Sequence, residues 1–132
     1  MPIRRCPSPA EAESALAALC TGAQPGEALF LFFGSAADDH GPSWCPDCVT
    51  ADPVLRSAIT RLRPDLTLYE CPVGERAAWK GVADHPYRLH PLFRIARIPT
   101  LVHVAHGGER GRLVEADCAR PDLVAAFLAR TP

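Results

Sequence analysis

The chain has 132 residues, of which 48% are hydrophobic, so residues 1–132 can form a single domain with its own core. Fourteen Lys and Arg against fifteen Asp and Glu leave a formal net charge of −1, and we therefore expect no binding to nucleic acid or to a membrane surface. No stretch approaches the ~20 apolar residues of a membrane span, and no apolar run follows the basic N-terminus, so we expect no secretory signal and a cytoplasmic location.

The first half of the chain predicts a helix, a strand and a second helix. A capping-box sequence over residues 8–11, with proline at the first helical position, starts an Ala- and Leu-rich helix that ends at Gly22. Residues 28–33 are continuously apolar, which predicts a strand buried on both faces. After a polar loop, apolar residues recur at helical spacing from Pro46 to about Leu62.

The second half predicts further strands and helices. They follow in this order: a core strand over 66–69, short helices within 74–93, a hairpin of strands over 100–104 and 112–115, and a last helix over 121–129. Gly107 and Gly108 lie between the two hairpin strands and are expected to form the turn. The alternation predicts an α/β fold with a mixed central sheet flanked by helices.

The motif Trp44-Cys45-Pro46-Asp47-Cys48 lies between a predicted buried strand and the helix that follows it. Outside a secretory context, C-x-x-C in this place indicates a redox-active pair of thiols. Backbone N–H groups and the helix dipole at the helix start favour the thiolate of Cys45, which we expect to be the attacking sulfur. Cys48 lies further into the helix and is expected to be less exposed and to resolve the mixed disulfide.

The other residues of the motif are expected to tune this pair. Pro46 suits the first helical position and stiffens the loop. Asp47 stabilises the helix start but opposes a thiolate on its neighbours. Trp44 has two interpretations, a flat surface that holds a substrate or a ring that covers the core.

Ile98 and Pro99 form a second signal, at the start of a hairpin strand. A proline there is either an ordinary strand start or part of a cis peptide. The dithiol motif elsewhere in the chain favours the cis form.

Together these features resemble the thioredoxin family. The resemblance runs from about residue 29 to 115 and rests on C-P-D-C entering a helix, on Pro53 within that helix, and on I-P-T before a hairpin. The W-C-P-D-C form, its long preceding loop and the V-G-E-R-x-x-W-K stretch over 73–80 are similar to a branch of small thioredoxin-related proteins.

The resemblance implies a thioredoxin fold in which Cys45 is the nucleophile, Cys48 is the resolving thiol, and Pro99 is cis and packed against them. The backbone at Ile98 would pair with an extended substrate strand. It also implies a protein-disulfide reductase that acts on disulfides of proteins, peptides or small molecules. No cofactor would be bound, and NADPH would supply electrons through a thioredoxin reductase.

Two features depart from the family pattern. Typical members carry a buried Asp on the strand before the motif, where it accepts the proton of the resolving cysteine, but residues 29–33 contain no acid. Asp38 and Asp39 lie in the following loop and are not given this role, which leaves Asp47 or a water. C-P-D-C in place of the usual C-G-P-C, together with the long loop, predicts a narrower substrate range.

Two other functions stay open beside a reductase. One is a thioredoxin-fold binding or adaptor module whose cysteines do not turn over. The other is a zinc site, which is disfavoured because a tetrahedral site needs a second ligand pair and the chain has no second C-x-x-C. We therefore expect no bound metal ion. We also expect the protein to be a monomer.

The four remaining cysteines, Cys6, Cys20, Cys71 and Cys118, are interpreted as structural or incidental thiols. Their spacing does not indicate a disulfide.

Overall fold

The structure is a computed structural model that describes residues 1–22, 26–36 and 41–130. Its elements, in chain order, are β1 (Ile3–Arg5), α1 (Pro9–Thr21), β2 (Ala28–Phe33), α2 (Pro46–Leu62), β3 (Thr67–Pro72), α3 (Arg76–Trp79), α4 (Pro86–Leu89), β4 (Thr100–Ala105), β5 (Gly108–Val114), the 3₁₀-helix η1 (Glu115–Ala119) and α5 (Pro121–Ala129). No helix in the described ranges is long and apolar enough to cross a membrane.

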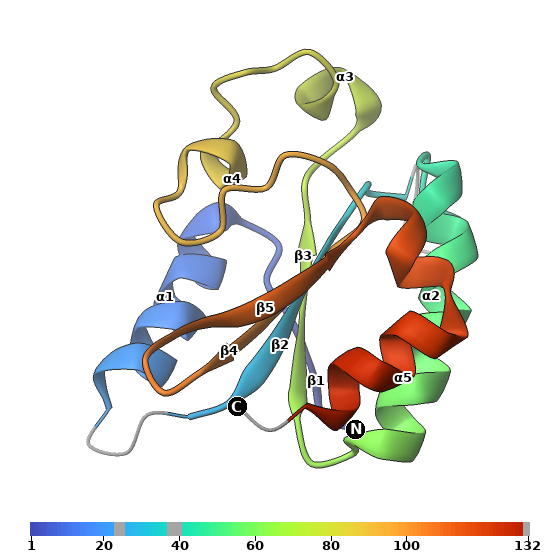
Figure 1. Cartoon of the computed structure of the whole chain (residues 1–132). Coiled ribbons are helices and arrows are strands. Elements are labelled where there is room, and N and C mark those ends of the chain that lie inside the picture. Colours follow the sequence, from blue (N-terminus) through green and yellow to red (C-terminus); the bar gives the residue numbers. More distant parts are fainter. Residues whose placement is uncertain (23–25, 37–40, 131–132) are drawn as a thin grey trace.

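The strands form one mixed five-stranded sheet in the order β1-β3-β2-β4-β5. Strand β3 runs parallel to β1 and β2, whereas β4 runs antiparallel to β2 and β5. Figure 1 shows α2 and α5 side by side on one face of the sheet and α1 on the other, with α3 and α4 at one end. The predicted mixed sheet between helices is confirmed.

Strand β2 joins two hydrophobic cores because its side chains alternate between the faces of the sheet. Phe30 and Phe32 belong to the core on the α1 side, where Phe32 packs edge-on against Tyr87 of α4. Leu29 and Leu31 belong to the core formed with α2 and α5. Both faces of β2 are thus buried, as the continuous apolar run predicts.

Two local predictions are also confirmed. Helix α1 begins after Ser8, whose side-chain oxygen accepts a hydrogen bond from the Glu11 N–H at 3.3 Å. The segment over 74–93 contains only the two short helices α3 and α4, because its prolines and glycines interrupt any longer helix.

Other boundaries differ from the prediction. Strand β1 was not predicted, because three exposed residues with two arginines have no alternating pattern, and the strand exists through its pairing with β3. Strand β3 extends to Pro72 because it pairs along the whole of β2. The hairpin turn is centred on His106 and Gly107, both with positive φ, so Gly108 already belongs to β5.

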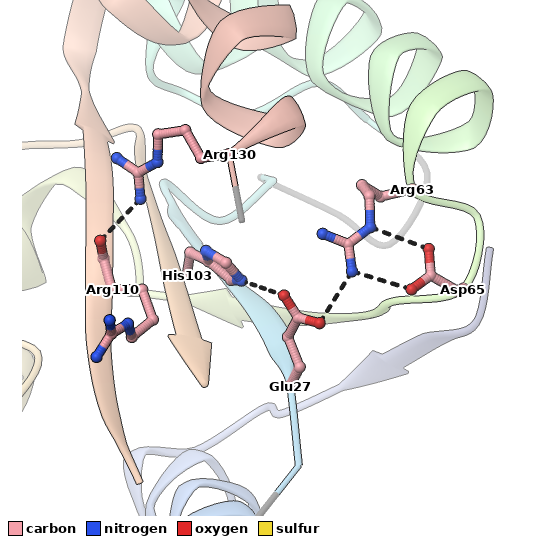
Figure 2. A network of polar contacts seen from close by, with 6 residues as sticks. All are labelled: Glu27, Arg63, Asp65, His103, Arg110 and Arg130. Atoms are coloured by element: carbon pink, nitrogen blue, oxygen red, sulfur yellow. Dashed lines mark hydrogen bonds and ion pairs between the residues drawn. The ribbon is translucent and has the colours of Figure 1, made fainter. Parts of the chain in front are cut away.

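A polar network lies at the end of the sheet opposite the start of α2 (Figure 2). The Glu27 carboxylate accepts hydrogen bonds from Arg63 at 2.9 Å and from buried His103 at 2.6 Å. Arg63 also pairs with Asp65 at 3.0 Å. These contacts join the segment before β2, the end of α2 and the middle of β4.

Candidate active site

The two cysteines of the motif lie at the N-terminus of α2. Cys45 is the N-cap residue, and its Sγ accepts a hydrogen bond from the Cys48 N–H at 3.3 Å. The sulfur therefore takes the place that a Ser or Asp oxygen occupies in an ordinary cap. Pro46 is the first helical residue, as predicted. In this position the Cys45 sulfur lies at the positive end of the helix dipole.

The loop before the motif is held by side-chain hydrogen bonds. The Ser43 hydroxyl donates to the Gly34 carbonyl oxygen at 2.5 Å and accepts from the Cys45 N–H at 3.1 Å. The Trp44 indole N–H donates to the Gly74 carbonyl oxygen at 2.8 Å. A Cβ atom at Gly34 would lie 2.6 Å from the Trp44 ring, so only glycine allows this close approach.

Two cavities meet the motif, and each one is lined by a different cysteine of the pair. We call the first the outer cleft; it has a volume of about 280 Å³ and is lined by Trp44, Cys45, Pro46, Asp47 and Ile98, among others. The second is the inner cavity; it has a volume of about 290 Å³, and its lining includes Ser43, Cys48, Asp52 and Pro99. All the predicted site residues therefore line one of these two spaces.

Overall exposure does not distinguish the two thiols. Cys45 is 6% exposed and Cys48 is 5% exposed, so Cys48 is the less exposed residue, as expected, but by a margin too small to separate their roles. The cavities make the difference, because Cys45 borders the outer cleft and Cys48 the inner cavity.

The surroundings of Cys48 favour its protonated form. Burial raises the pKa of the Cys48 thiol, and the neighbouring Cys45 sulfur raises it further, while hydrogen bonding with Gly34 and Ser43 opposes these effects. Cys48 is therefore held as a neutral thiol beside Cys45.

Ile98 and Pro99 lie between the two cavities. The peptide bond that joins them is cis. Ile98 lines the outer cleft and Pro99 lines the inner cavity together with Cys48. The Pro99 carbonyl oxygen accepts a hydrogen bond from the Glu115 N–H at 2.7 Å, which links this segment to the start of η1.

The acidic residues near the motif are divided between the two cavities. Asp47 lines the outer cleft, on the side of Cys45. Asp52 lines the inner cavity with Cys48 and is hydrogen-bonded to Arg56 at 2.9 Å. Sequence reasoning missed Asp52, although a carboxylate four residues after Cys48 on one helix face is a readable signal. Asp38 and Asp39 lie outside the described residues.

The far wall of the outer cleft comes from the segment that contains α3 and α4. Trp79 and Lys80 line the cleft there, together with Arg88. The Arg88 guanidinium lies 3.6 Å from the Trp79 ring centroid and donates to the carbonyl oxygens of Trp79, Val82 and Ala96. Arg88 therefore connects this wall by hydrogen bonds to the segment just before Ile98. Sequence reasoning found no role for it.

A metal site needs several ligands close together. Within the described ranges, no group of three or more His, Cys, Asp or Glu side chains is placed to hold an ion. The zinc alternative therefore has no ligand set around Cys45 and Cys48 in that part of the chain.

The family model of the thioredoxin domain-containing protein 17-like thioredoxin domain matches residues 8–130. Thioredoxin domain-containing protein 17 of Epinephelus coioides is 37% identical over 99 residues, which cover 75% of this chain and 76% of that protein. The thioredoxin-like protein Clot of Arabidopsis thaliana is 33% identical over 101 residues, which cover 76% of this chain and 75% of that protein. The crystal structure of oxidized thioredoxin O1 from Arabidopsis thaliana superimposes with a TM-score of 0.64 at 22% identity, covering 98% of this chain and 100% of that one. The chain therefore has a thioredoxin fold and belongs to the thioredoxin domain-containing protein 17-like family.

Proposed function

We propose that this protein is a thiol-disulfide oxidoreductase that reduces disulfides of peptides, proteins or small molecules through Cys45 and Cys48. The observation that carries the proposal is the Cys45 sulfur in the cap position of α2, where it accepts the Cys48 N–H at 3.3 Å. A helix N-terminus stabilises negative charge, and the thiolate is the reactive form of cysteine.

The reaction consists of two exchanges. In the first, the Cys45 thiolate attacks one sulfur of the substrate disulfide, the substrate S–S bond breaks, and the other substrate sulfur leaves as a thiolate. In the second, Cys48 loses its proton and attacks the Cys45 sulfur, which releases the rest of the substrate as a thiolate. The substrate gains two electrons, and the protein is left with a Cys45–Cys48 disulfide.

The second exchange needs an acceptor for the Cys48 proton. Burial raises the pKa of this thiol, so the proton does not leave without help. Asp52 borders the same inner cavity, whereas Asp47 borders the outer cleft. We assign Asp52, acting directly or through water in the inner cavity, as the acceptor in place of the buried acid that β2 lacks.

The outer cleft is the proposed substrate site. Its volume of about 280 Å³ suits a small disulfide or a short extended segment rather than a folded surface. The backbone at Ile98 forms one edge of the cleft and would pair with such a segment, as in β-strand addition. The cleft is lined by cations and by acids, Lys80, Arg88 and Arg97 with Asp47 and Glu115, and Arg97 pairs with Glu115 at 3.1 Å, so the site offers partners of both charges to a polar substrate.

The remaining functional assignments are part of the same proposal. A thioredoxin reductase that draws on NADPH would return the oxidised pair to dithiol, with no other bound cofactor. The protein would act as a monomer in the cytoplasm, where thiols are kept reduced.

The decisive experiment compares single cysteine variants with the unaltered chain. We expect Cys48→Ser to accumulate a mixed disulfide with cystine or insulin, because Cys45 attacks but no resolving thiol follows. We expect Cys45→Ser to form none and to lose turnover. Mass spectrometry of the intact protein detects the adduct, and NADPH consumption with thioredoxin reductase reports turnover.

Two results would contradict the proposal. Full turnover by either variant would remove the dithiol mechanism. Binding of a protein partner by the unaltered chain, with no reduction of any disulfide and no adduct on Cys48→Ser, would instead favour an adaptor. Running protein and small-molecule disulfides in parallel determines which substrate class the outer cleft accepts.

A further inference from the structure

A second pair of thiols lies away from the motif, where β1 meets β3. Arg5 of β1 is in register with Glu70 of β3, and the next residue on each side is a cysteine, Cys6 and Cys71. The Cys6 N–H donates to the Glu70 carbonyl oxygen at 2.8 Å, which continues the parallel pairing. Both cysteines are buried in the core on the α1 side of the sheet, where each one shifts the pKa of the other.

The backbone spacing of this pair suits a disulfide. Paired strands lie ~4.8 Å apart. Disulfides join residues whose Cα atoms are roughly 4.4–6.8 Å apart. Cys6 and Cys71 occupy adjacent places on paired strands, so they meet this requirement although 65 positions separate them in the chain.

The two sulfurs have different electrostatic environments. The Cys71 thiol donates to the Tyr69 carbonyl oxygen at 3.8 Å, and its polar contact with Cys6 lowers the pKa of the Cys6 thiol despite burial. Burial, and then contact with Cys6, raises the pKa of Cys71. Cys6 is therefore the sulfur that ionises first, and Cys71 retains its proton.

A polar group lies on one side of the pair, and the short edge strand β1 lies on the other. The buried Tyr87 hydroxyl lies beside Cys71 and has no hydrogen-bond partner among the described residues. Cys6 is 4% exposed but directly follows β1, a three-residue edge strand whose residues are all exposed. Opening β1 uncovers little apolar surface, so a small oxidant reaches Cys6 without global unfolding.

We propose that Cys6 and Cys71 are a second redox pair, which a peroxide converts to a disulfide that fastens the N-terminal strand to the sheet. The Cys6 thiolate attacks one peroxide oxygen, the O–O bond breaks, and a sulfenic acid forms, while the other oxygen takes up the proton that the Cys6 thiol released and leaves as water or an alcohol. The Cys71 sulfur then attacks the Cys6 sulfur, the S–O bond breaks, and water leaves with the Cys71 proton. The two thiols lose two electrons, which the peroxide gains.

The test uses the full chain with Cys45→Ser and Cys48→Ser, so that its result does not depend on the proposed reductase. The protein is treated with hydrogen peroxide and digested without reductant by trypsin and a glutamyl endopeptidase. Cleavage after Arg5, Glu11, Glu70 and Glu75 places the two cysteines in the separate peptides 6–11 and 71–75. We expect a linked species with the summed mass of the two peptides less two hydrogens.

Further variants separate this pair from the other thiols. Cys20→Ala is the matched control and should leave the linked species unchanged, because Cys20 is partly exposed and lies outside the pair. Cys6→Ala should abolish the linked species. In the parent double variant, oxidation should raise the Tm by several degrees, because the crosslink closes a loop of roughly 65 residues in the unfolded chain. Cys6→Ala should also abolish this shift.

Either of two results would overturn the proposal. One is a Cys6–Cys71 pair that stays reduced at peroxide concentrations that already oxidise Cys20. The other is a disulfide that joins Cys6 to Cys20 instead.

Discussion

Replacing Gly34 by alanine would place a methyl group where the Trp44 ring now lies. The new Cβ would be 2.6 Å from Trp44 Cε2, 2.8 Å from Trp44 Nε1 and 3.0 Å from Ser43 Oγ. Non-bonded heavy atoms prefer separations of roughly 3.5–4.0 Å, so the indole must move by about 1 Å. This movement breaks its 2.8 Å hydrogen bond to the Gly74 carbonyl oxygen.

The expected loss of stability follows from these contacts. Overpacking of this kind costs about 1–3 kcal/mol. The lost indole hydrogen bond adds about 1 kcal/mol. Gly34→Ala should therefore lower the free energy of unfolding by about 2–4 kcal/mol, which for a chain of this size lowers the Tm by roughly 7–14 °C.

The same substitution should slow the chemistry, because Ser43 holds the Cys45 N–H and would be displaced as well. A misplacement of this size costs up to about 100-fold in rate. We expect the reaction of Cys45 with cystine to fall by about 10- to 100-fold, measured as the rate of adduct formation on a Cys48→Ser background. Urea denaturation gives the change in stability independently.

Gly108→Ala is the matched control. Among the described residues no atom lies within 4 Å of a Cβ at this position, and its φ is outside the left-handed region. Its stability should stay within about 0.5 kcal/mol of the unaltered chain. If Gly34→Ala matched this control in both stability and rate, the close packing of Trp44 over Gly34 would not hold the site.

Three further substitutions test other parts of the structure. Asp52→Asn should slow the attack of Cys48 on the mixed disulfide while leaving adduct formation by Cys45 intact, which rapid-mixing kinetics can separate. Burial alone would raise the pKa of Glu27, but the hydrogen bonds from Arg63 and His103 outweigh burial and lower this pKa. The network therefore stabilises the fold above about pH 4.3, and this stabilisation is lost as the pH falls further. Glu27→Gln should make the Tm depend less on pH in this acid range. Trp44→Phe should lower stability by about 1 kcal/mol through loss of the indole hydrogen bond.

Each of these predictions has an outcome that contradicts it. For Asp52, the critical result is a second step as fast as that of the unaltered chain, with Asp47→Asn as the comparison on the outer-cleft side. For Glu27, it is an unchanged loss of stability in acid after substitution. For Trp44→Phe, it is a free energy of unfolding equal to that of the unaltered chain. Oxidation of the C-x-x-C should also change the fluorescence of the unaltered protein, and an equal change in Trp44→Phe, which keeps Trp79, would contradict the place of Trp44 beside the pair.

Local patterns in the sequence were enough to predict most of the helices and strands. The continuous apolar run over 28–33 indicated a strand buried on both faces, and the capping box at Ser8 marked the start of α1. Strand β1 and the full length of β3 were not readable, because they exist through pairing with strands distant in the chain. A strand of three residues carries no local sequence pattern that identifies its pairing partner.

The residue types and spacing of the motif determined that two thiols meet at the start of a helix, because a turn of helix brings Cys45 and the Cys48 N–H together. Only the tertiary structure decided what surrounds each sulfur. Exposure barely differs between the two cysteines, whereas each borders a different cavity: Cys45 and Asp47 line the outer cleft, and Cys48 and Asp52 line the inner cavity. The contact between Cys6 and Cys71 arises in the same way, since strand pairing brings together side chains that are far apart in the sequence.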